Sequence, residues 1–142
     1  MDEKQDIRWQ QRFNSFQQAL NRLKEVVNQC EMESLSELEK EGLIQRFEYT
    51  FELSWKMLQD VLKYRGYSDI AGPNMTLQQA FKDGYITDHD GWRSMKKGRE
   101  TTSHTYNEGS AIEIVKNIYE EYIKLLIELE NKMVEIQRET TD

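Results

Sequence analysis

The stretch Ser110–Met133, SAIEIVKNIYEEYIKLLIELENKM, shows most directly which kind of fold this chain adopts. Its apolar residues recur at steps of three and four positions, which places them along one face of a helix. They are Ala111, Val115, Ile118, Tyr122, Leu125, Leu129 and Met133. Ser110 and Glu113 have the spacing of a capping box, which predicts the helix start. The spacing therefore predicts a long helix that packs its apolar face against neighbouring helices.

Two further long helices are predicted from the same kind of pattern. The first runs from about Ile7 to Glu31. The second begins at Ser36, where Glu39 completes a capping box, and ends at Arg65, because Gly66 is a natural stop. The apolar stripes are Trp9, Phe13, Phe16, Leu20, Leu23 and Val27 in the first, and Leu43, Phe47, Phe51, Leu58 and Leu62 in the second.

Shorter helices are predicted in the middle of the chain. Residues 66–75 contain the only proline and read as the main loop. Thr76 with Gln79 resembles a capping box that opens a short helix ending near Gly84. Thr87 or Asp88 then caps a helix that carries Trp92, Met95 and Arg99. The predicted fold is all-α, an antiparallel four-helix up-and-down bundle with a short extra helix, as a single domain over residues 1–142.

Composition narrows the classes of function. The chain has 142 residues, 32% of them charged, and a formal net charge of -7, which argues against coating DNA or RNA by bulk electrostatics. Any RNA contact must therefore rest on a local patch. Cys30 is the only cysteine, so no internal disulfide or thiolate metal cluster is expected, and Cys30 is expected to be buried. Neither a signal peptide nor an apolar run of membrane-spanning length is evident, so we expect a cytoplasmic protein without membrane contact.

One short segment contains the groups needed to handle a phosphate. It runs from Arg99 to Tyr106, RETTSHTY. Arginine binds phosphate oxygens with a charged planar fork of donors, and histidine exchanges a proton near neutral pH. Tyrosine stacks on a base or accepts a transferred group. We therefore expect Arg99, His104 and Tyr106 to form a site, with Lys96 at the same helical spacing as a further RNA-binding residue.

A single continuous helix aligns only part of this segment. Arg99 and Tyr106 share a face two turns apart, whereas His104 is rotated from Arg99 by roughly 140°. Either the helix loosens at Thr101–Ser103, where hydroxyl and β-branched side chains weaken it, or a second copy supplies the complementary groups across a two-fold axis. A symmetric pair also suits metal-free RNA cleavage, which needs a base, an acid and a cation.

A row of charged residues lies in the second predicted helix. Glu48, Glu52 and Lys56 are spaced four positions apart. This spacing favours a solvated row of ion pairs on the helix surface.

The motif and the aromatic block that precedes it resemble a known family. The Arg-x4-His-x-Tyr pattern of Arg99, His104 and Tyr106 resembles the signature of the HEPN superfamily. The block Arg46–Lys56, RFEYTFELSWK, is similar to its branch of nucleotidyltransferase substrate-binding proteins, which are related to HepT toxins. The resemblance extends from about residue 8 to residue 129. Glu100 departs from the pattern, because family members often carry a neutral polar residue there and a carboxylate repels RNA.

The resemblance implies a dimer of helical bundles in which the two Arg/His motifs meet in one cleft. In the toxin branch such dimers are metal-independent ribonucleases that need no cofactor. A small nucleotidyltransferase encoded beside them acts as the antitoxin by adenylylating the motif tyrosine, here Tyr106. Arg99 and His104 would then be the catalytic residues.

Two other interpretations stay open. The protein is alternatively a non-catalytic nucleotide-binding or acceptor subunit of a two-component nucleotidyltransferase, with Arg99, Lys96 and Tyr106 binding the nucleotide. In the third interpretation the motif is structural, and His104 satisfies a helix end.

Overall fold

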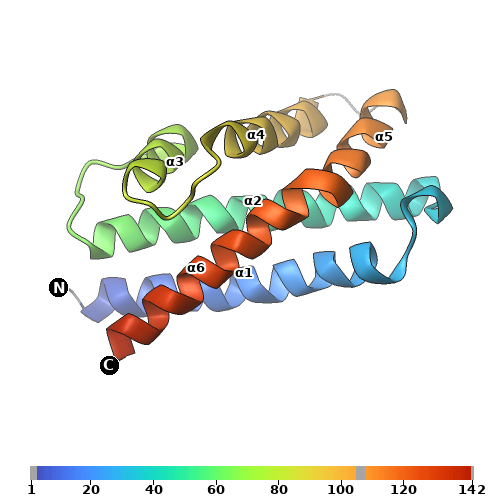
Figure 1. Cartoon of the computed structure of the whole chain (residues 1–142). Coiled ribbons are helices and arrows are strands. Elements are labelled where there is room, and N and C mark those ends of the chain that lie inside the picture. Colours follow the sequence, from blue (N-terminus) through green and yellow to red (C-terminus); the bar gives the residue numbers. More distant parts are fainter. Residues whose placement is uncertain (1–2, 105–107, 142) are drawn as a thin grey trace.

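The computed structural model describes residues 3–104 and 108–141, and the elements in that part of the chain are all helical (Figure 1). In chain order they are α1 (Glu3–Gln29), η1 (Met32–Ser34), α2 (Glu37–Tyr64), α3 (Gly72–Lys82), α4 (His89–His104), α5 (Glu108–Asn117), η2 (Ile118–Tyr122) and α6 (Ile123–Thr141). The all-α class predicted from the sequence is confirmed. None of the helices described is long and apolar enough to cross a membrane.

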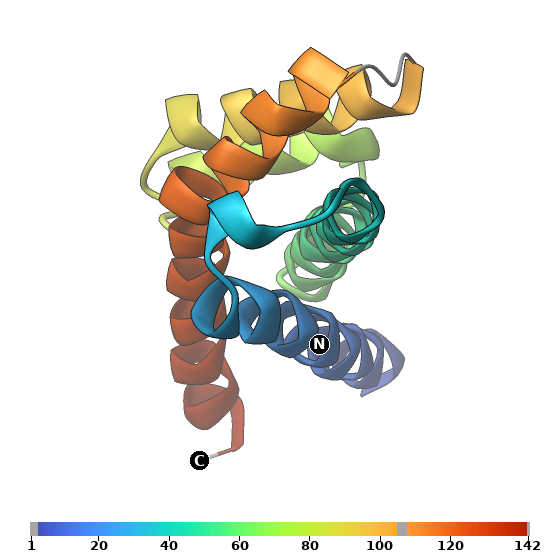
Figure 2. The same cartoon turned by 90° about the vertical axis from the view of Figure 1, so that its right-hand side faces the viewer.

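The helices form a bundle around the pair α1 and α2, which run antiparallel and pack along their lengths (Figure 1). α4 and the short α3 lie on the opposite side of α2 from α1. α5, η2 and α6 follow one another as a bent rod that crosses α2 and α1 obliquely (Figure 2). α3 is the predicted short extra helix.

The apolar stripes form one continuous core. The seven stripe residues of the last predicted helix are all buried, as are those of the first two helices except Val27, which is partly buried. Burying one large apolar side chain contributes about 1.5–3 kcal/mol, so this core is the main source of stability. Cys30 is only partly buried at the edge of the core, and its backbone carbonyl accepts a hydrogen bond from Tyr119 Oη at 3.1 Å.

Two predicted helix starts are confirmed. The Ser36 Oγ accepts a hydrogen bond from the Glu39 amide at 3.1 Å, and Glu39 Oε1 accepts one from the Ser36 amide at 2.9 Å. The Ser36 amide thereby lowers the pKa of Glu39 below its ordinary value. Asp88 Oδ1 accepts a hydrogen bond from the Gly91 amide at 2.9 Å, which makes Asp88 rather than Thr87 the cap of α4.

Two other predicted caps are wrong. α3 already begins at Gly72, with Pro73 in its first turn, where the fixed φ of proline favours a helix. Thr76 therefore lies inside the helix, and its hydroxyl donates to the Gly72 carbonyl at 2.7 Å. α5 has begun by Glu108, which places Ser110 in the first turn instead of before it.

The rod formed by α5, η2 and α6 has a π-helical turn where the sequence predicts a regular helix. Tyr122 lies in this turn and is buried. Its Oη donates a hydrogen bond to the Ser94 carbonyl at 3.2 Å, and its ring stacks on Phe47 with centroids 5.3 Å apart. Tyr122 thus connects α4 with α2, the two helices that carry the candidate site.

Candidate functional site

α4 carries the Arg of the motif, and the helix is held tightly against its neighbours. Trp92 and Met95 anchor it in the core. A Cβ built at Gly98 would lie 3.1 Å from Tyr122 Oη and 3.2 Å from Ile114 Cδ1. Such contacts are tighter than normal packing, so the absence of a side chain at Gly98 allows this close approach. The packing fixes the next residue, Arg99, at the edge of α4 that faces α2.

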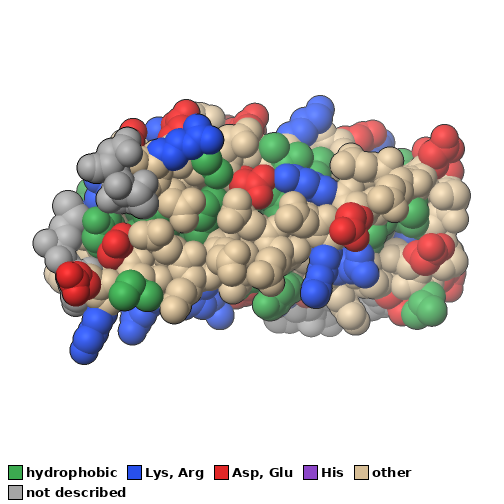
Figure 3. All heavy atoms as spheres, turned by 90° about the horizontal axis from the view of Figure 1, so that it is seen from below, with side chains coloured by type: hydrophobic (Ala, Val, Ile, Leu, Met, Phe, Trp, Pro, Cys, Tyr) green, Lys and Arg blue, Asp and Glu red, His purple; other side chains and the backbone are tan. Residues whose placement is uncertain are grey.

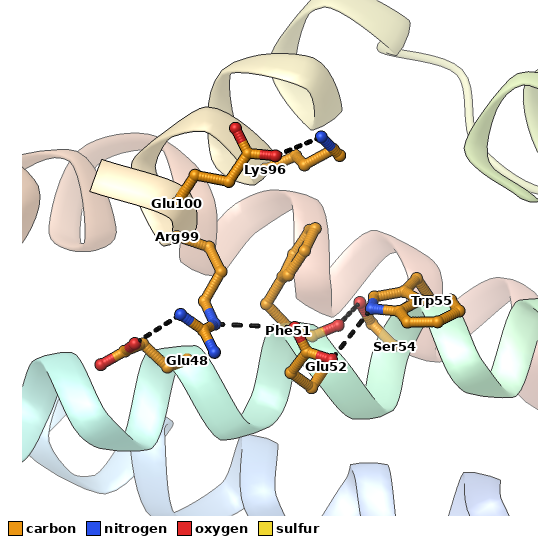
Figure 4. Close-up of polar contacts among 8 residues, drawn as sticks. All are labelled: Glu48, Phe51, Glu52, Ser54, Trp55, Lys96, Arg99 and Glu100. Carbon is orange, nitrogen blue, oxygen red and sulfur yellow. Dashed lines mark hydrogen bonds and ion pairs between the residues drawn. The ribbon is translucent and has the colours of Figure 1, made fainter. Parts of the chain in front are cut away.

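The Arg99 guanidinium extends from α4 to two carboxylates on α2 (Figure 4). Its Nη1 lies 2.7 Å from Glu48 Oε2, and its buried Nε lies 3.6 Å from Glu52 Oε1. The first is a charge-assisted hydrogen bond, and the second is an ion pair at longer range. The three side chains are between a fifth and about a third exposed, so solvent and ligands can reach them.

Glu52 is itself held by a neighbour on α2. The indole Nε1 of Trp55 donates a hydrogen bond to Glu52 Oε2 at 3.2 Å (Figure 4). Lys56 lies with its Nζ 5.9 Å from the centroid of the Trp55 ring. The expectation of a solvated row of ion pairs is therefore wrong for Glu48 and Glu52, because both carboxylates face α4 and pair with Arg99. Sequence analysis missed Glu48, Glu52 and Trp55 as site residues, although all three stand in the block that resembles the family.

Lys96 does not join Arg99 at α2. It pairs with Glu100 on the side of α4 that points away from α2 (Figure 4). This pair neutralises part of the charge of Glu100, the residue that departs from the family pattern. Arg99 thus contacts α2, and the Lys96–Glu100 pair covers another face of the same helix.

The placement of His104 and Tyr106 is only partly described. α4 is helical through His104, so the expected loosening at Thr101–Ser103 is not found. Thr101 Oγ1 donates to the Lys97 carbonyl at 3.0 Å, the bond to the preceding turn that a threonine hydroxyl forms within a helix. The side chain of His104 and the whole of Tyr106 lie outside the described residues. The rotation of roughly 140° between Arg99 and His104 therefore applies to the folded chain.

The chain has recognisable relatives. Residues 11–135 match the family described as "Nucleotidyltransferase substrate binding protein like". The chain belongs to this family. Its resemblance to HEPN and HepT-like proteins is thus confirmed.

Two relatives are similar in sequence or in structure. A protein of Haemophilus influenzae named "Probable ribonuclease HepT" is 32% identical over 87 residues, which are 54% of this chain and 56% of that protein. The match thus spans little more than half the length of the curated relative. A crystal structure of a Thermus thermophilus protein superposes with a TM-score of 0.72 at 34% identity, covering 80% of this chain and 94% of the other.

The arrangement of Arg99 with Glu48 and Glu52 is suited to binding an anion that takes the place of a carboxylate. Arginine presents a planar fork to carboxylate and phosphate alike. Because Glu48 and Glu52 already pair with the guanidinium, an incoming phosphate competes with these carboxylates for its donors. Until then, the two carboxylates keep the guanidinium extended and oriented.

Proposed function

We propose that this protein is a toxin-like HEPN ribonuclease that cleaves RNA without a metal ion at the interface of a homodimer. The observation that carries the proposal is the position of Arg99, extended and accessible on α4 with its fork directed by two carboxylates. The family membership and the name of the Haemophilus influenzae relative support the same chemistry.

Arg99 and His104 have different roles in this proposal. Arg99 stabilises the negative charge that builds on the phosphorus-bound oxygens during attack by the 2′-hydroxyl. His104 exchanges the proton of the attacking or the leaving oxygen. Lys96 adds positive charge for the RNA strand, and its pairing with Glu100 makes this contribution small.

The helical backbone of α4 supports the dimer. Because the positions of Arg99 and His104 are separated by a rotation of roughly 140° about the axis of α4, we do not expect one chain to direct both residues at the same phosphate. A second copy related by a two-fold axis brings another Arg99 and another His104 to the cleft. Two imidazoles then supply the base and the acid that metal-free cleavage needs.

A nucleotidyltransferase is the proposed protein partner, in keeping with the family description. Adenylylation of Tyr106 would add a purine and a phosphodiester charge seven residues along the chain from Arg99. The modification would compete with RNA for the Arg99 fork, as an antitoxin mechanism requires.

The second candidate function is a non-catalytic nucleotide-binding or acceptor subunit of a two-component nucleotidyltransferase. The pairing of Arg99 with Glu48 and Glu52 favours it, because a guanidinium held by carboxylates is less available to RNA. In that case Arg99, Lys96 and Tyr106 bind the nucleotide, and RNA is not cleaved.

An RNA cleavage assay separates the two functions. Purified protein is incubated with total RNA in the presence of EDTA, and we expect cleavage that the chelator leaves unchanged. Arg99→Ala and His104→Ala are each expected to lower the rate by roughly 10² to 10⁴. Arg8→Ala, which removes an exposed charge from α1, should cleave like the wild type. Absence of cleavage by folded wild-type dimer, or its loss with EDTA, would favour the acceptor subunit or a metal-dependent enzyme.

A further inference from the structure

A hollow of about 360 Å³ lies between α1 and α2. Its lining residues are Ser15, Gln18, Ala19, Arg22, Arg46 and Tyr49. The small side chains of Ser15 and Ala19 leave the space open, since larger residues at these positions would fill it. The volume is in the lower part of the range of about 300–1,000 Å³ that small-ligand sites occupy.

The hollow combines two guanidiniums with no opposing charge. None of its lining residues carries a carboxylate, and Arg22 and Arg46 form no ion pair in the described part of the chain. Arg46 Nη1 donates to the Arg22 backbone carbonyl at 3.3 Å, which orients the guanidinium and leaves its other donors for a ligand. Both side chains are exposed, and they form a local positive patch in a chain with a net charge of -7. They indicate an anionic ligand.

Tyr49 contributes an aromatic surface to the same hollow. Its side chain is 58% exposed, whereas Phe47 and Phe51 on the same helix are buried. An exposed ring beside two arginines offers a stacking face for a base next to donors for a phosphate. Viewed from the α1 side, uncharged side chains and backbone cover much of the middle of the molecular surface (Figure 3).

We propose that this hollow is a nucleotide-binding site, with the phosphate on Arg22 and Arg46 and the base stacked on Tyr49. The ligand is one nucleotide unit, either free or as part of a single-stranded RNA. The site does not depend on the proposed catalysis, because its lining residues do not include Arg99 or the two carboxylates that pair with it.

The hollow and the Arg99 site use adjoining faces of α2, since Tyr49 and Glu52 are three residues apart on this helix. Glu48 and Glu52 face α4, whereas Arg46 and Tyr49 face the groove with α1. An α-helix with its side chains is about 10–12 Å across, so a strand held in the hollow can continue over the exposed ridge of α2 toward Arg99. RNA bound in the hollow would then lie beside the proposed dimer cleft that contains Arg99, and not inside that cleft.

Binding of a short fluorescein-labelled 2′-O-methyl RNA, measured by fluorescence anisotropy, tests the proposal without cleavage. This RNA has no free 2′-hydroxyl, so failure of the nuclease proposal does not affect the result. Tyr49→Ala is expected to weaken binding by about 5- to 100-fold, because stacking of one base is lost. Tyr49→Phe keeps the ring and should bind within about two-fold of the wild type. The logarithm of the association constant falls linearly with the logarithm of the salt concentration, and Arg46→Gln should make this slope less steep by about 0.7 because one phosphate contact is lost.

Two controls complete the experiment. Arg8→Gln removes an equal charge from the exposed surface of α1 and should bind like the wild type. If unlabelled AMP displaces the labelled RNA, a free nucleotide occupies the site. If Tyr49→Ala and Arg46→Gln weaken RNA binding but AMP does not displace the RNA, the RNA strand is the ligand. The proposal is overturned if wild-type protein does not bind the RNA, if Tyr49→Ala and Arg46→Gln bind it unchanged, or if Arg8→Gln loses as much affinity.

Discussion

At the residue scale, Arg99 is held between two helices by charges of opposite sign. Ion pairs that solvent reaches contribute only about 0–1 kcal/mol, because screening and side-chain entropy offset the attraction. A phosphate that enters the site therefore replaces Glu48 or Glu52 at small cost. The carboxylates orient the guanidinium and compete only weakly with a phosphate for it.

This balance predicts the effect of Glu48→Gln on RNA binding. Glutamine keeps the size of the side chain and removes its charge, so the Arg99 fork becomes more available to phosphate. Affinity for non-cleavable RNA should rise about two- to five-fold relative to Glu41→Gln, which removes an exposed charge from the same helix. Fluorescence anisotropy measures both variants. An equal gain with Glu41→Gln would show a general charge effect, and weaker binding by Glu48→Gln would show that the pair is needed to position Arg99.

The sequence predicted Arg99 as a site residue from the chemistry of its side chain. It did not predict which residues Arg99 contacts. Which residue types handle a phosphate is a local property, so the motif Arg99–Tyr106 stands out in the chain. Which carboxylates meet Arg99 depends on how α4 packs on α2, and the spacing of Glu48 and Glu52 alone fits a solvated row equally well. The angle between Arg99 and His104 follows from helix geometry and was therefore predictable.

At the element scale, the site depends on the close packing of α4 against η2 and α5. Gly98 and the π-helical turn with Tyr122 make that contact. The π turn was not predicted, because the apolar stripe keeps steps of three and four through it. The Thr76 cap was wrongly predicted because α3 begins at Gly72, with Pro73 in its first turn, so that the cap is Ala71, five residues before Thr76. Short capping patterns occur by chance, whereas long apolar stripes do not.

A matched pair of glycine substitutions tests the close packing. Gly42 lies in α2 with no neighbouring atom within 4 Å of a built Cβ, so Gly42→Ala should raise the free energy of unfolding by about 0.5–1 kcal/mol. Gly98→Ala also gains helix propensity, but its methyl meets Tyr122 Oη at 3.1 Å, so its gain should be smaller or reversed. Urea unfolding measures both. An equal or larger gain for Gly98→Ala would contradict the close approach of α4.

At the scale of the whole molecule, the all-α fold class could be predicted from the sequence. The way in which the helices cross one another, and the contacts with other molecules, could not. Apolar stripes indicate which face of each helix is buried, and the observed core consists of those faces. The oblique crossing of α5, η2 and α6 over α1 and α2 depends on side-chain packing between helices and not on the stripe of any one of them. The dimer and the nucleotidyltransferase partner are proposals that concern surfaces between molecules.

Adenylylation tests the proposed partner. Incubation with the proposed partner nucleotidyltransferase, ATP and magnesium should add one or more adenylyl groups to the wild type and none to Tyr106→Phe, as measured by mass spectrometry. Tyr49→Phe, which alters another tyrosine, should be modified like the wild type. RNA cleavage should fall in proportion to the modified fraction. Equal modification of Tyr106→Phe would place the acceptor elsewhere.

The central claim is that two copies of the motif act together in one cleft, and mixing subunits tests it most directly. Wild-type chains are exchanged with increasing amounts of His104→Ala chains at constant total concentration, and RNA cleavage is measured at each fraction. If both histidines are required, only dimers of two wild-type chains are active, and an equal mixture should keep about a quarter of the wild-type rate. A rate that falls in direct proportion to the wild-type fraction, with about half remaining in the equal mixture, would mean that each chain acts alone and would contradict the shared cleft.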